Sequence, residues 1–329
     1  MSQKWDPNRI DKEAPALLKK LRALSKRLSG YFVGKQEIID LLILCTMAQE
    51  PLLLVGVPGT AKSDIIVKFC QAIGVGEEDY FEYMLTKFTE PSEILGPIDI
   101  SLLKKGSYIR RVEGKLPTAS VAFLDEIFKS NSAILNTLLT IINERKFYQD
   151  GRPESVNLRM LFAATNEIPE FTELGALRDR FTLKVESESV RHHSFRSLIE
   201  QGIRNASYKA LNQRPWVKGD ISLEDFEKLN FHMEHMIQRA TQTKKMDELF
   251  PKSVFSLFHK IIGTLERDLD VAISDRKVIK LYKLAIMHAR LMHGGSVNRE
   301  DLVILRYVAD RMQNFKPVRE KVDTFLQLE

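Results

Sequence analysis

The feature that most constrains this chain is the stretch PLLLVGVPGTAKS at residues 51–63. The apolar residues 52–55 indicate a short buried strand, and the apolar-periodic run 64–73 indicates a helix. Between them lies a turn rich in glycine and proline that ends in Lys62 and Ser63. In such a strand, loop and helix, backbone N–H groups and the helix N-terminus can converge on phosphate oxygens. We expect Lys62 to reach the β- and γ-phosphates and the Ser63 hydroxyl to bind Mg²⁺.

One position departs from the phosphate-loop pattern G-x-x-x-x-G-K-[ST], because Ala61 stands where the last glycine is expected. Alanine adopts ordinary helical dihedrals readily but is strained at positive φ. The sequence therefore predicts a right-handed backbone at Ala61. The alternative is a loop of small residues that matches the pattern only in part and binds no phosphate.

Two later apolar runs end in polar side chains at the point where each predicted strand stops. In VAFLDEI, residues 121–127, Asp125 can hold the Mg²⁺ shell through water and Glu126 can polarise a water for attack on the γ-phosphate. In MLFAATN, residues 160–166, Asn166 can orient that water. Taken singly, each pattern also fits a strand that ends in an acidic loop or in an ordinary turn.

Three arginines are candidates for contacts with phosphate. Arg178 and Arg180 precede a last predicted strand in ALRDRFTLKV, where they could pair locally with an aspartate or supply an arginine finger to a neighbouring subunit. Arg276 falls in the first turn of a helix capped by Ser274, where its charge opposes the helix dipole. That local cost suggests a phosphate partner at a domain cleft, although an exposed arginine is an equal alternative.

The remaining segments divide the chain into an α/β part and a helical part. Residues 91–117 read as a loop-and-hairpin insertion, and 146–158 as a hairpin with its turn at residues 150–151. Upstream, the segment 31–33 could wall an adenine or simply join two helices. Exposed basic residues of the insertion could contact a partner or be ordinary solvated charges: Lys104, Lys105, Arg110 and Arg111. After residue 190 we expect only helices, at 191–205, 223–239, 251–267, 276–291, 299–312 and 318–327.

Composition sets wide limits on the class of protein. The 329 residues suffice for two domains, and the formal charge of +5 is spread along the chain, which is weak evidence for nucleic-acid binding. Cys45 and Cys70 sit in apolar helical patterns without metal-like spacing, as small core residues do in a reducing compartment. The N-terminal stretch does not resemble a signal peptide, and no apolar run reaches membrane-spanning length. We therefore expect a cytoplasmic protein that does not insert into membranes.

Taken together, GVPGTAKS, VAFLDEI, AATN, LRDRF and SDRK resemble the motifs of AAA+ ATPases. The alanine before Lys62, the segment FTEPSEILGPIDI and SAILNTLLTIINERKF are similar to the MoxR family in particular. SDRK and EYMLT lean toward the RavA branch, without room in this sequence for the RavA C-terminal extension. The resemblance extends over about residues 28–307. It implies a P-loop NTPase core of three layers with a five-stranded, mostly parallel sheet in 1–189, and a helical lid in 190–329.

The resemblance also implies a role for each matched residue. Residues 91–117 would be the helix-2 insertion and 146–158 the pre-sensor-1 hairpin, with Arg276 as sensor 2 against the nucleotide. Ser63 and Asp125 would hold Mg²⁺. The nucleotide would be bound by Val33, Gly34, Pro58, Gly59, Thr60, Ala61, Lys62, Ser63 and Asp64. The catalytic residues would be Lys62, Glu126 as the Walker B base, Asn166 as sensor 1, and Arg180 as the finger, with Arg178 as the alternative.

The function implied is Mg²⁺-dependent hydrolysis of ATP to ADP and phosphate. Family members form hexameric rings and remodel or activate partner complexes in a chaperone-like way, often with proteins that carry a von Willebrand factor A domain. Two alternatives stay open: a binding module that uses nucleotide only as a switch, and a motor that remodels nucleic acid. The complete water-activating pair Glu126 and Asn166 argues against the first, and the scattered basic residues argue against the second.

Overall fold

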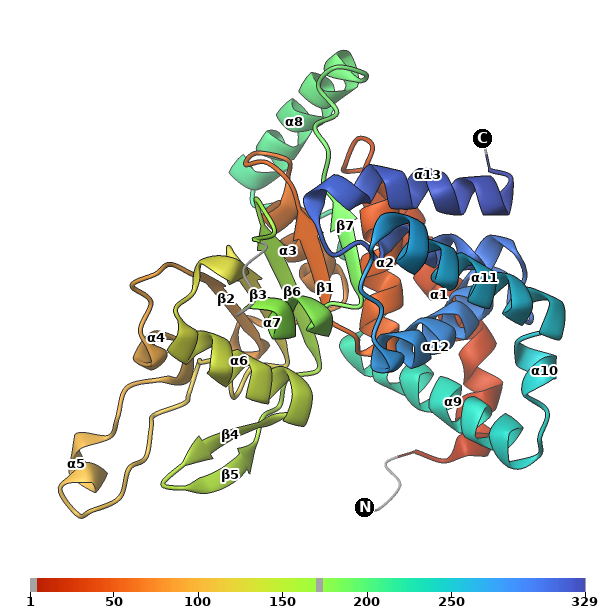
Figure 1. Ribbon diagram of the computed structural model, residues 1–329. Coiled ribbons are helices and arrows are strands. Elements are labelled where there is room, and N and C mark those ends of the chain that lie inside the picture. The colour runs from red at the N-terminus through yellow and green to blue at the C-terminus, as the bar shows by residue number, and fades with distance from the viewer. Residues whose placement is uncertain (1–4, 170–173, 329) are drawn as a thin grey trace.

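The computed structural model describes residues 5–169 and 174–328 (Figure 1). Its centre is a five-stranded sheet in the order β2-β3-β6-β1-β7, in which every neighbouring pair is parallel. Parallel strands that are buried on both faces have continuous apolar sequences, and all four residues of β1 are indeed buried. The predicted α/β fold is confirmed. In that spatial order the strands are Tyr80–Met84, Val121–Asp125, Met160–Thr165, Leu52–Val55 and Leu183–Glu186.

The register of the sheet brings the predicted polar residues to one edge. Val55 pairs with Thr165, so the loop after β1 and the residue after β6 leave the sheet at the same level. Leu124 pairs with Ala163, which places the end of β3 beside them. The helices of this part of the chain are α1 Pro7–Ser29, α2 Gln36–Ala48, α3 Lys62–Ala72, α6 Ser132–Glu144 and α7 Gly175–Arg180.

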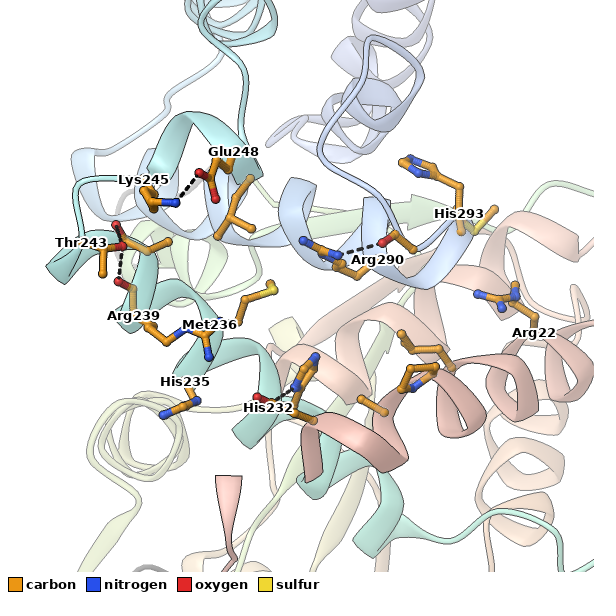
Figure 2. A pocket seen from close by; sticks show the side chains of 18 residues that line it. Arg22, His232, His235, Met236, Arg239, Thr243, Lys245, Glu248, Arg290 and His293 are labelled. Carbon is orange, nitrogen blue, oxygen red and sulfur yellow. Dashed lines mark hydrogen bonds and ion pairs between the residues drawn. The ribbon is translucent and has the colours of Figure 1, made fainter. Parts of the chain in front are cut away.

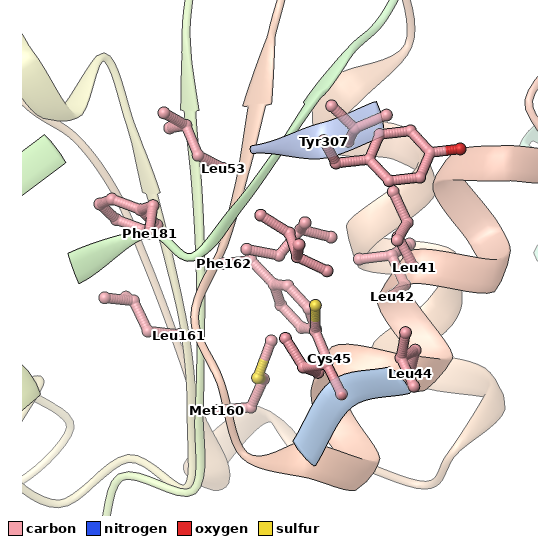
Figure 3. Close-up of a cluster of buried hydrophobic side chains, with 14 of the residues drawn as sticks. Leu41, Leu42, Leu44, Cys45, Leu53, Met160, Leu161, Phe162, Phe181 and Tyr307 are labelled. Atoms are coloured by element: carbon pink, nitrogen blue, oxygen red, sulfur yellow. The ribbon is translucent and has the colours of Figure 1, made fainter. Parts of the chain in front are cut away.

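Figure 3 shows the core between the sheet and α2. Phe162 of β6 faces Leu42 and Cys45 of the helix, whereas Leu53 of β1 points to the opposite face of the sheet; all four side chains are fully buried. Cys45 and Cys70 are both buried and free, and burial raises the pKa of both thiols. The cysteines therefore act as small core residues, as their apolar surroundings in the sequence predict.

The segment 91–117 is more helical than the predicted loop and hairpin. It contains two short helices, α4 Pro91–Leu95 and α5 Ile100–Leu103, and its two arms are joined by backbone hydrogen bonds around an isolated β-bridge between Ile98 and Arg110. A capping box at Glu90 and Glu93 starts α4, and the Asp99 side chain caps α5, so polar side chains set these turns. The basic residues are not equivalent, because Arg111 pairs with Asp99 at 2.9 Å whereas Lys104 and Lys105 are exposed.

The hairpin at 146–158 forms as predicted, from β4 Lys146–Gln149 and β5 Arg152–Ser155. Its turn residues Asp150 and Gly151 both have positive φ, 49° and 73°, as a two-residue turn between twisted strands requires. Gln149 accepts a hydrogen bond from the Arg110 backbone N–H at 2.6 Å, so the hairpin and the insertion lie side by side (Figure 1).

The C-terminal part of the described chain is helical, as predicted, but its winding differs at one place. Residues 300–307 form a tight 3₁₀ helix, η4, instead of an α-helix. With three residues per turn, positions 301, 304 and 307 and positions 302, 305 and 308 form two adjacent buried rows. The helices are α8 Phe195–Ala210, α9 Leu223–Gln242, α10 Met246–Leu249, α11 Lys252–Leu269, α12 Asp275–Met292, η4 Glu300–Tyr307 and α13 Phe315–Leu326.

The N-terminal helices pack against this helical region. Asn230 on α9 donates to the Met47 carbonyl at 3.0 Å, and Arg22 on α1 donates to the Leu291 carbonyl at 2.6 Å. α12 also lies against α2 (Figure 1). The helical region is therefore joined to α1 and α2, and α8 projects away from the other helices (Figure 1).

Candidate nucleotide-binding site

A cavity of about 330 Å³ lies at the carboxyl edge of the sheet, where the phosphate loop meets the ends of β3 and β6. Open parallel sheets bind ligands at this edge because the loops after neighbouring strands diverge there. Most of the predicted phosphate and catalytic residues line it. These are Pro58, Gly59, Thr60, Ala61, Lys62, Ser63 and Asp64 of the loop, with Asp125, Glu126 and Asn166; Met84 completes the wall.

Ala61 contradicts the prediction of a right-handed backbone. Its φ of 65° and ψ of 20° are left-handed, and it is the N-cap of α3. An L-residue in this conformation costs about 1–2 kcal/mol, which the surrounding loop must offset. The Ala61 methyl packs against the core, and the carbonyls of Thr60 and Ala61 accept hydrogen bonds from Ser187 and from the Ile65 N–H. The tertiary contacts of the loop therefore override the local preference, and the loop keeps the shape that the glycine pattern describes.

Lys62 lies at the base of this cavity and is buried. Its ammonium donates to the Val57 carbonyl at 3.1 Å and to Asn166 Oδ1 at 3.2 Å, and it also contacts the Gly56 carbonyl. Burial lowers the pKa of Lys62, and the carboxylates of Asp125 and Glu126 partly oppose that shift. The loop carbonyls thus hold the lysine in place beside the residues predicted to act on a phosphate.

Glu126 and Asn166 form a hydrogen-bonded pair, with the Asn166 amide donating to Glu126 Oε1. The other carboxylate oxygen, Glu126 Oε2, is buried and has no hydrogen-bond partner among the described residues. An unpaired buried acceptor costs about 1–3 kcal/mol, so this atom is suited to bind a water molecule. The backbone of Glu126 is left-handed, with φ 52°, and its N–H donates to Asp125 Oδ1 at 2.9 Å. Strain at this position is typical of residues held for function.

The donors present fit a magnesium ion that is shared with a phosphate ligand. Ser63 offers a hydroxyl and Asp125 a carboxylate in the same cavity. Within the described residues there is no cluster of three or more histidine, cysteine or acidic side chains that could enclose a metal. Mg²⁺ commonly takes one or two protein ligands and completes its shell with waters and substrate phosphates. Ser63 and Asp125 would therefore hold it from the protein side.

A second cavity, of about 320 Å³, lies on the other side of the phosphate loop. It shares Gly59, Thr60, Ala61 and Asp64 with the first, so one ligand could extend through both. Its apolar wall and two amides, on Gln201 and Asn205, suit a base. The apolar wall is formed by Tyr31, Phe32, Val33, Val190 and Leu198.

Of the two predicted adenine contacts, Val33 lines this cavity and Gly34 supports it from outside. Gly34 has φ 65°, and a β-carbon there would lie 2.8 Å from Val190 Cγ1. Glycine at this position therefore allows the turn to approach the segment that follows β7.

Lys35 is a structural contact that sequence reasoning did not identify. Its buried ammonium donates to Ser187 Oγ at 3.1 Å and to the Glu188 carbonyl, and burial lowers its pKa. Ser187 Oγ donates in turn to the Thr60 carbonyl at 2.9 Å. This chain of bonds fixes the phosphate loop to the strand end after β7. The sequence shows only a lysine after Gly34, and nothing in it indicates a partner so far along the chain.

The three candidate arginines line neither of these cavities. Arg178 donates to the Pro169 carbonyl at 3.0 Å. Arg180 lies 4.0 Å from Asp179, and its Nε is buried without a hydrogen-bond partner in the described chain. Burial lowers the pKa of Arg180, and the charge of Arg276 lowers it further. Ser274, the N-cap of α12, donates to Asp179 Oδ1 at 3.1 Å, so the helix start that carries Arg276 lies beside Arg180. The structure thus brings Arg180 and Arg276 together, apart from the phosphate loop of their own chain.

Comparison with known proteins agrees with this geometry. A family model described as the MoxR domain in the MoxR-vWA-beta-propeller ternary systems matches residues 19–230. Two uncharacterized proteins of Methanocaldococcus jannaschii are 35% and 33% identical to this chain, over 88% and 89% of it and 70% of each relative. The structural protein ORF618 of Acidianus two-tailed virus is 28% identical over 81% of this chain and 43% of its own length.

A solved structure of a candidate ATPase from Cytophaga hutchinsonii has a similar fold, with a TM-score of 0.73 over 98% of both chains at 16% identity. The fold and the arrangement of the loop residues define an AAA+ ATPase of the P-loop class. Within that class, the chain belongs to the MoxR family. No helix in the described part of the chain is long and apolar enough to cross a membrane.

Proposed function

We propose that this chain hydrolyses ATP to ADP and phosphate in the cavity at the carboxyl edge of the sheet. The observation that carries the proposal is the Asn166–Glu126 pair, whose buried Oε2 is unpartnered beside the phosphate loop. The loop N–H groups and Lys62 would bind the β- and γ-phosphates. Mg²⁺, held by Ser63 and Asp125, would neutralise phosphate charge when bound.

The water that attacks would be oriented by the Glu126–Asn166 pair. Glu126 Oε2 would accept a hydrogen bond from that water and take its proton as the oxygen bonds to the γ-phosphorus. The bond from phosphorus to the β–γ bridging oxygen breaks, and ADP leaves with phosphate. Asn166 holds Glu126 Oε1, so the free oxygen is the one available for the water.

Substitution Glu126→Gln tests this proposal because glutamine keeps the shape and the hydrogen bond to Asn166 but cannot take the proton. We expect phosphate release to fall by about 10²-fold or more while Mg–ATP still binds, since general-base catalysis contributes on the order of 10²–10⁴. Wild-type chain that binds Mg–ATP without turnover would instead support the nucleotide-switch alternative. Turnover unchanged in the variant would remove Glu126 from the mechanism.

We further propose that the chain acts as a homo-oligomer, as the hexameric rings of the family suggest. One support is the position of Arg180 and Arg276 away from their own phosphate loop, where a neighbouring subunit could receive them. Another is α8, which has no buried residue and exposes Phe195, Ile199 and Ile203 on one face at 59%, 46% and 64%. These positions follow helical spacing and form an apolar stripe beside the base cavity.

Light scattering with size-exclusion chromatography tests the assembly. The Glu126→Gln chain with ATP should elute as one species of several subunits, and Ile203→Asp should shift it toward monomer. Thermal unfolding of the Ile203→Asp chain would confirm that it folds. A wild-type chain that stays monomeric with ATP at high concentration would contradict the proposal.

The matching family model represents the MoxR domain of ternary systems, which combine it with a von Willebrand factor A component and a β-propeller. We propose that this ATPase remodels or activates such a partner complex. A pull-down from cells of its source with Glu126→Gln chain in ATP should retain a protein with a von Willebrand factor A domain, and Lys62→Ala chain should not. Equal recovery by both variants would argue against a nucleotide-dependent client.

A further inference from the structure

A cavity of about 920 Å³ lies between α1, α9, α10 and the C-terminal end of α12, and it shares no lining residue with the two nucleotide cavities (Figure 2). Its walls combine the N-terminal helix with three elements of the helical region. Nothing in the ATPase chemistry uses these residues. The volume is near the upper end of that of ordinary ligand pockets, so the cavity can admit a ligand larger than a single ion.

The lining is strongly biased toward basic side chains. Its two carboxylates are already paired, Asp11 with His232 at 2.7 Å and Glu248 with Lys245 at 2.8 Å. The three arginines of the lining, Arg22, Arg239 and Arg290, form no ion pair with any residue that the structure describes. The basic and potentially basic residues in the lining are Arg22, Arg239, Lys245, Arg290, His232, His235 and His293.

Two of the arginines are held in place by backbone carbonyls, which leave their charge uncompensated. Arg22 donates to the Leu291 carbonyl at 2.6 Å, and Arg290 donates to the Gly294 carbonyl at 2.8 Å. The Arg290 Nε is buried without an acceptor among the described residues, and burial lowers the pKa of this guanidinium. Arg239 makes no side-chain hydrogen bond within the described chain. Fixed guanidinium groups with free donors are the usual receptors for oxyanions.

The arrangement favours carboxylates spaced along a peptide over one compact phosphate. Figure 2 shows the labelled side chains distributed along the cavity, from Lys245 and Arg239 at one end, past Arg290, to Arg22 and His293 at the other. Compact phosphate sites gather backbone N–H groups, but Gly294 N–H donates to the Ala289 carbonyl and Gly295 N–H to His293. The lining also contains apolar side chains: Leu18, Met236, Leu249 and Met292.

We propose that this cavity binds an acidic peptide segment of a partner protein, with its carboxylates on Arg239, Arg290 and Arg22 and its apolar side chains against the methionines. The proposal goes beyond ATP hydrolysis and does not depend on it. Charge complementarity would give the specificity for acidic segments. Because the three arginines lie on separate helices, they suit a peptide in an extended conformation.

Fluorescence anisotropy tests the proposal with a short fluorescein-labelled peptide of alternating glutamate and leucine. The matched probe replaces every glutamate by glutamine. The wild-type chain should bind the glutamate peptide at least about tenfold more tightly, because charge-assisted hydrogen bonds contribute about 1.5–3 kcal/mol each. The difference should shrink as salt is added.

Arg239→Gln and Arg290→Gln locate the binding. Each should weaken binding of the glutamate peptide by about tenfold. Arg239→Gln is the cleaner variant because it removes no side-chain hydrogen bond or ion pair among the described residues, whereas Arg290 also holds the Gly294 carbonyl. The matched control is Arg196→Gln on α8, whose side chain is 92% exposed and far from the lining, and it should leave binding unchanged.

Three results would overturn the proposal: equal binding of the two probes, unchanged binding in both cavity variants when thermal unfolding shows them folded, or stronger competition by sodium triphosphate or duplex DNA than by unlabelled glutamate peptide. The last result would assign the cavity to phosphate ligands. Phosphate release measured on the same variants should equal that of wild type. If wild-type chain lacked turnover, the ATPase proposal alone would fail and the peptide measurement would still stand.

Discussion

The phosphate cavity and the surface that carries Arg180 and Arg276 differ in how completely their charged groups are connected. In the cavity, Lys62 contacts Asn166 and Asn166 contacts Glu126, so the groups form one connected network. On the other surface the charge of Arg276 lowers the pKa of Arg180, and Arg180 Nε lacks a partner among the described residues. The charged groups of the first region are bonded to one another within one chain, whereas Arg180 in the second region has only a long contact with Asp179, at 4.0 Å.

This difference is the basis for our proposal that one chain supplies only part of a complete catalytic site. The network of Lys62, Glu126 and Asn166 can bind phosphate and orient water, but it contains no arginine to stabilise charge in the transition state. The arginines sit elsewhere in the same molecule. We therefore interpret the two regions as halves of a site that is completed between subunits.

The largest expected effect separates catalysis from binding. Arg180→Ala should lower phosphate release by about 10³-fold, the low end of what an arginine finger contributes, and leave affinity for Mg–ATP unchanged. Steady-state phosphate release and nucleotide binding are measured on the same protein. Arg178→Ala is the matched control and should have a smaller effect, because Arg178 is bonded to the Pro169 carbonyl. A fall in nucleotide affinity in Arg180→Ala would break the comparison by placing Arg180 in the cavity of its own chain.

Lys62→Ala should act on binding, in contrast to Arg180→Ala. Loss of a buried ammonium that reaches the phosphates should weaken Mg–ATP affinity by about 10–100-fold, the equivalent of about 1.5–3 kcal/mol. Titration with a fluorescent ATP analogue measures this. Lys105→Ala is the control, since Lys105 is exposed and lines neither nucleotide cavity. Unchanged affinity in Lys62→Ala would mean that the loop does not bind phosphate.

The contribution of Lys277, which follows Arg276 on α12, to the free energy of unfolding should depend on pH. Burial, the main cause, lowers the pKa of Lys277 from its ordinary 10.5 to about 8, and the neighbouring Lys184 is shifted in the same direction. Between pH of about 8 and 10.5, Lys277 carries a proton in the unfolded chain that it has released in the folded chain. The free energy of unfolding contributed by Lys277 therefore rises with pH through this window, by up to about 1.4 kcal/mol per pH unit.

Urea unfolding across that window compares wild type with Lys277→Met. The variant should lose part of the rise, and exposed Lys105→Met should keep it. Identical slopes for wild type and Lys277→Met would show that Lys277 keeps its ordinary pKa in the folded protein.

The smallest expected effect concerns Ala61. Ala61→Gly relieves a left-handed alanine, worth about 1–2 kcal/mol, and adds freedom to the unfolded chain, which costs about 0.4–1 kcal/mol. We expect a net stabilisation of roughly 0.5 kcal/mol by urea unfolding, with ATP affinity unchanged. A destabilisation above about 1 kcal/mol would show that the packing of the Ala61 methyl outweighs its backbone strain.

Residues 58–64 and the ends of two apolar strands could be predicted from sequence because each is a contiguous pattern. Parallel strands then bring Glu126 and Asn166 to one edge without further information. The conformation of Ala61 could not, since a local preference is overruled by contacts with distant residues. The bond between Lys35 and Ser187 and the bond between Ser274 and Asp179 depend on how separate elements pack, and no local pattern encodes such contacts.

Mixing two inactive variants tests most directly whether the catalytic site is shared between subunits. Glu126→Gln chain keeps Arg180, and Arg180→Ala chain keeps Glu126. Co-assembled in Mg–ATP, the pair should regain phosphate release well above the sum of the separate proteins, because some cavities then receive an intact Arg180 beside an intact Glu126. If the mixture shows subunit exchange by fluorescence but releases no more phosphate than the two variants alone, Arg180 acts within its own chain and the account is contradicted.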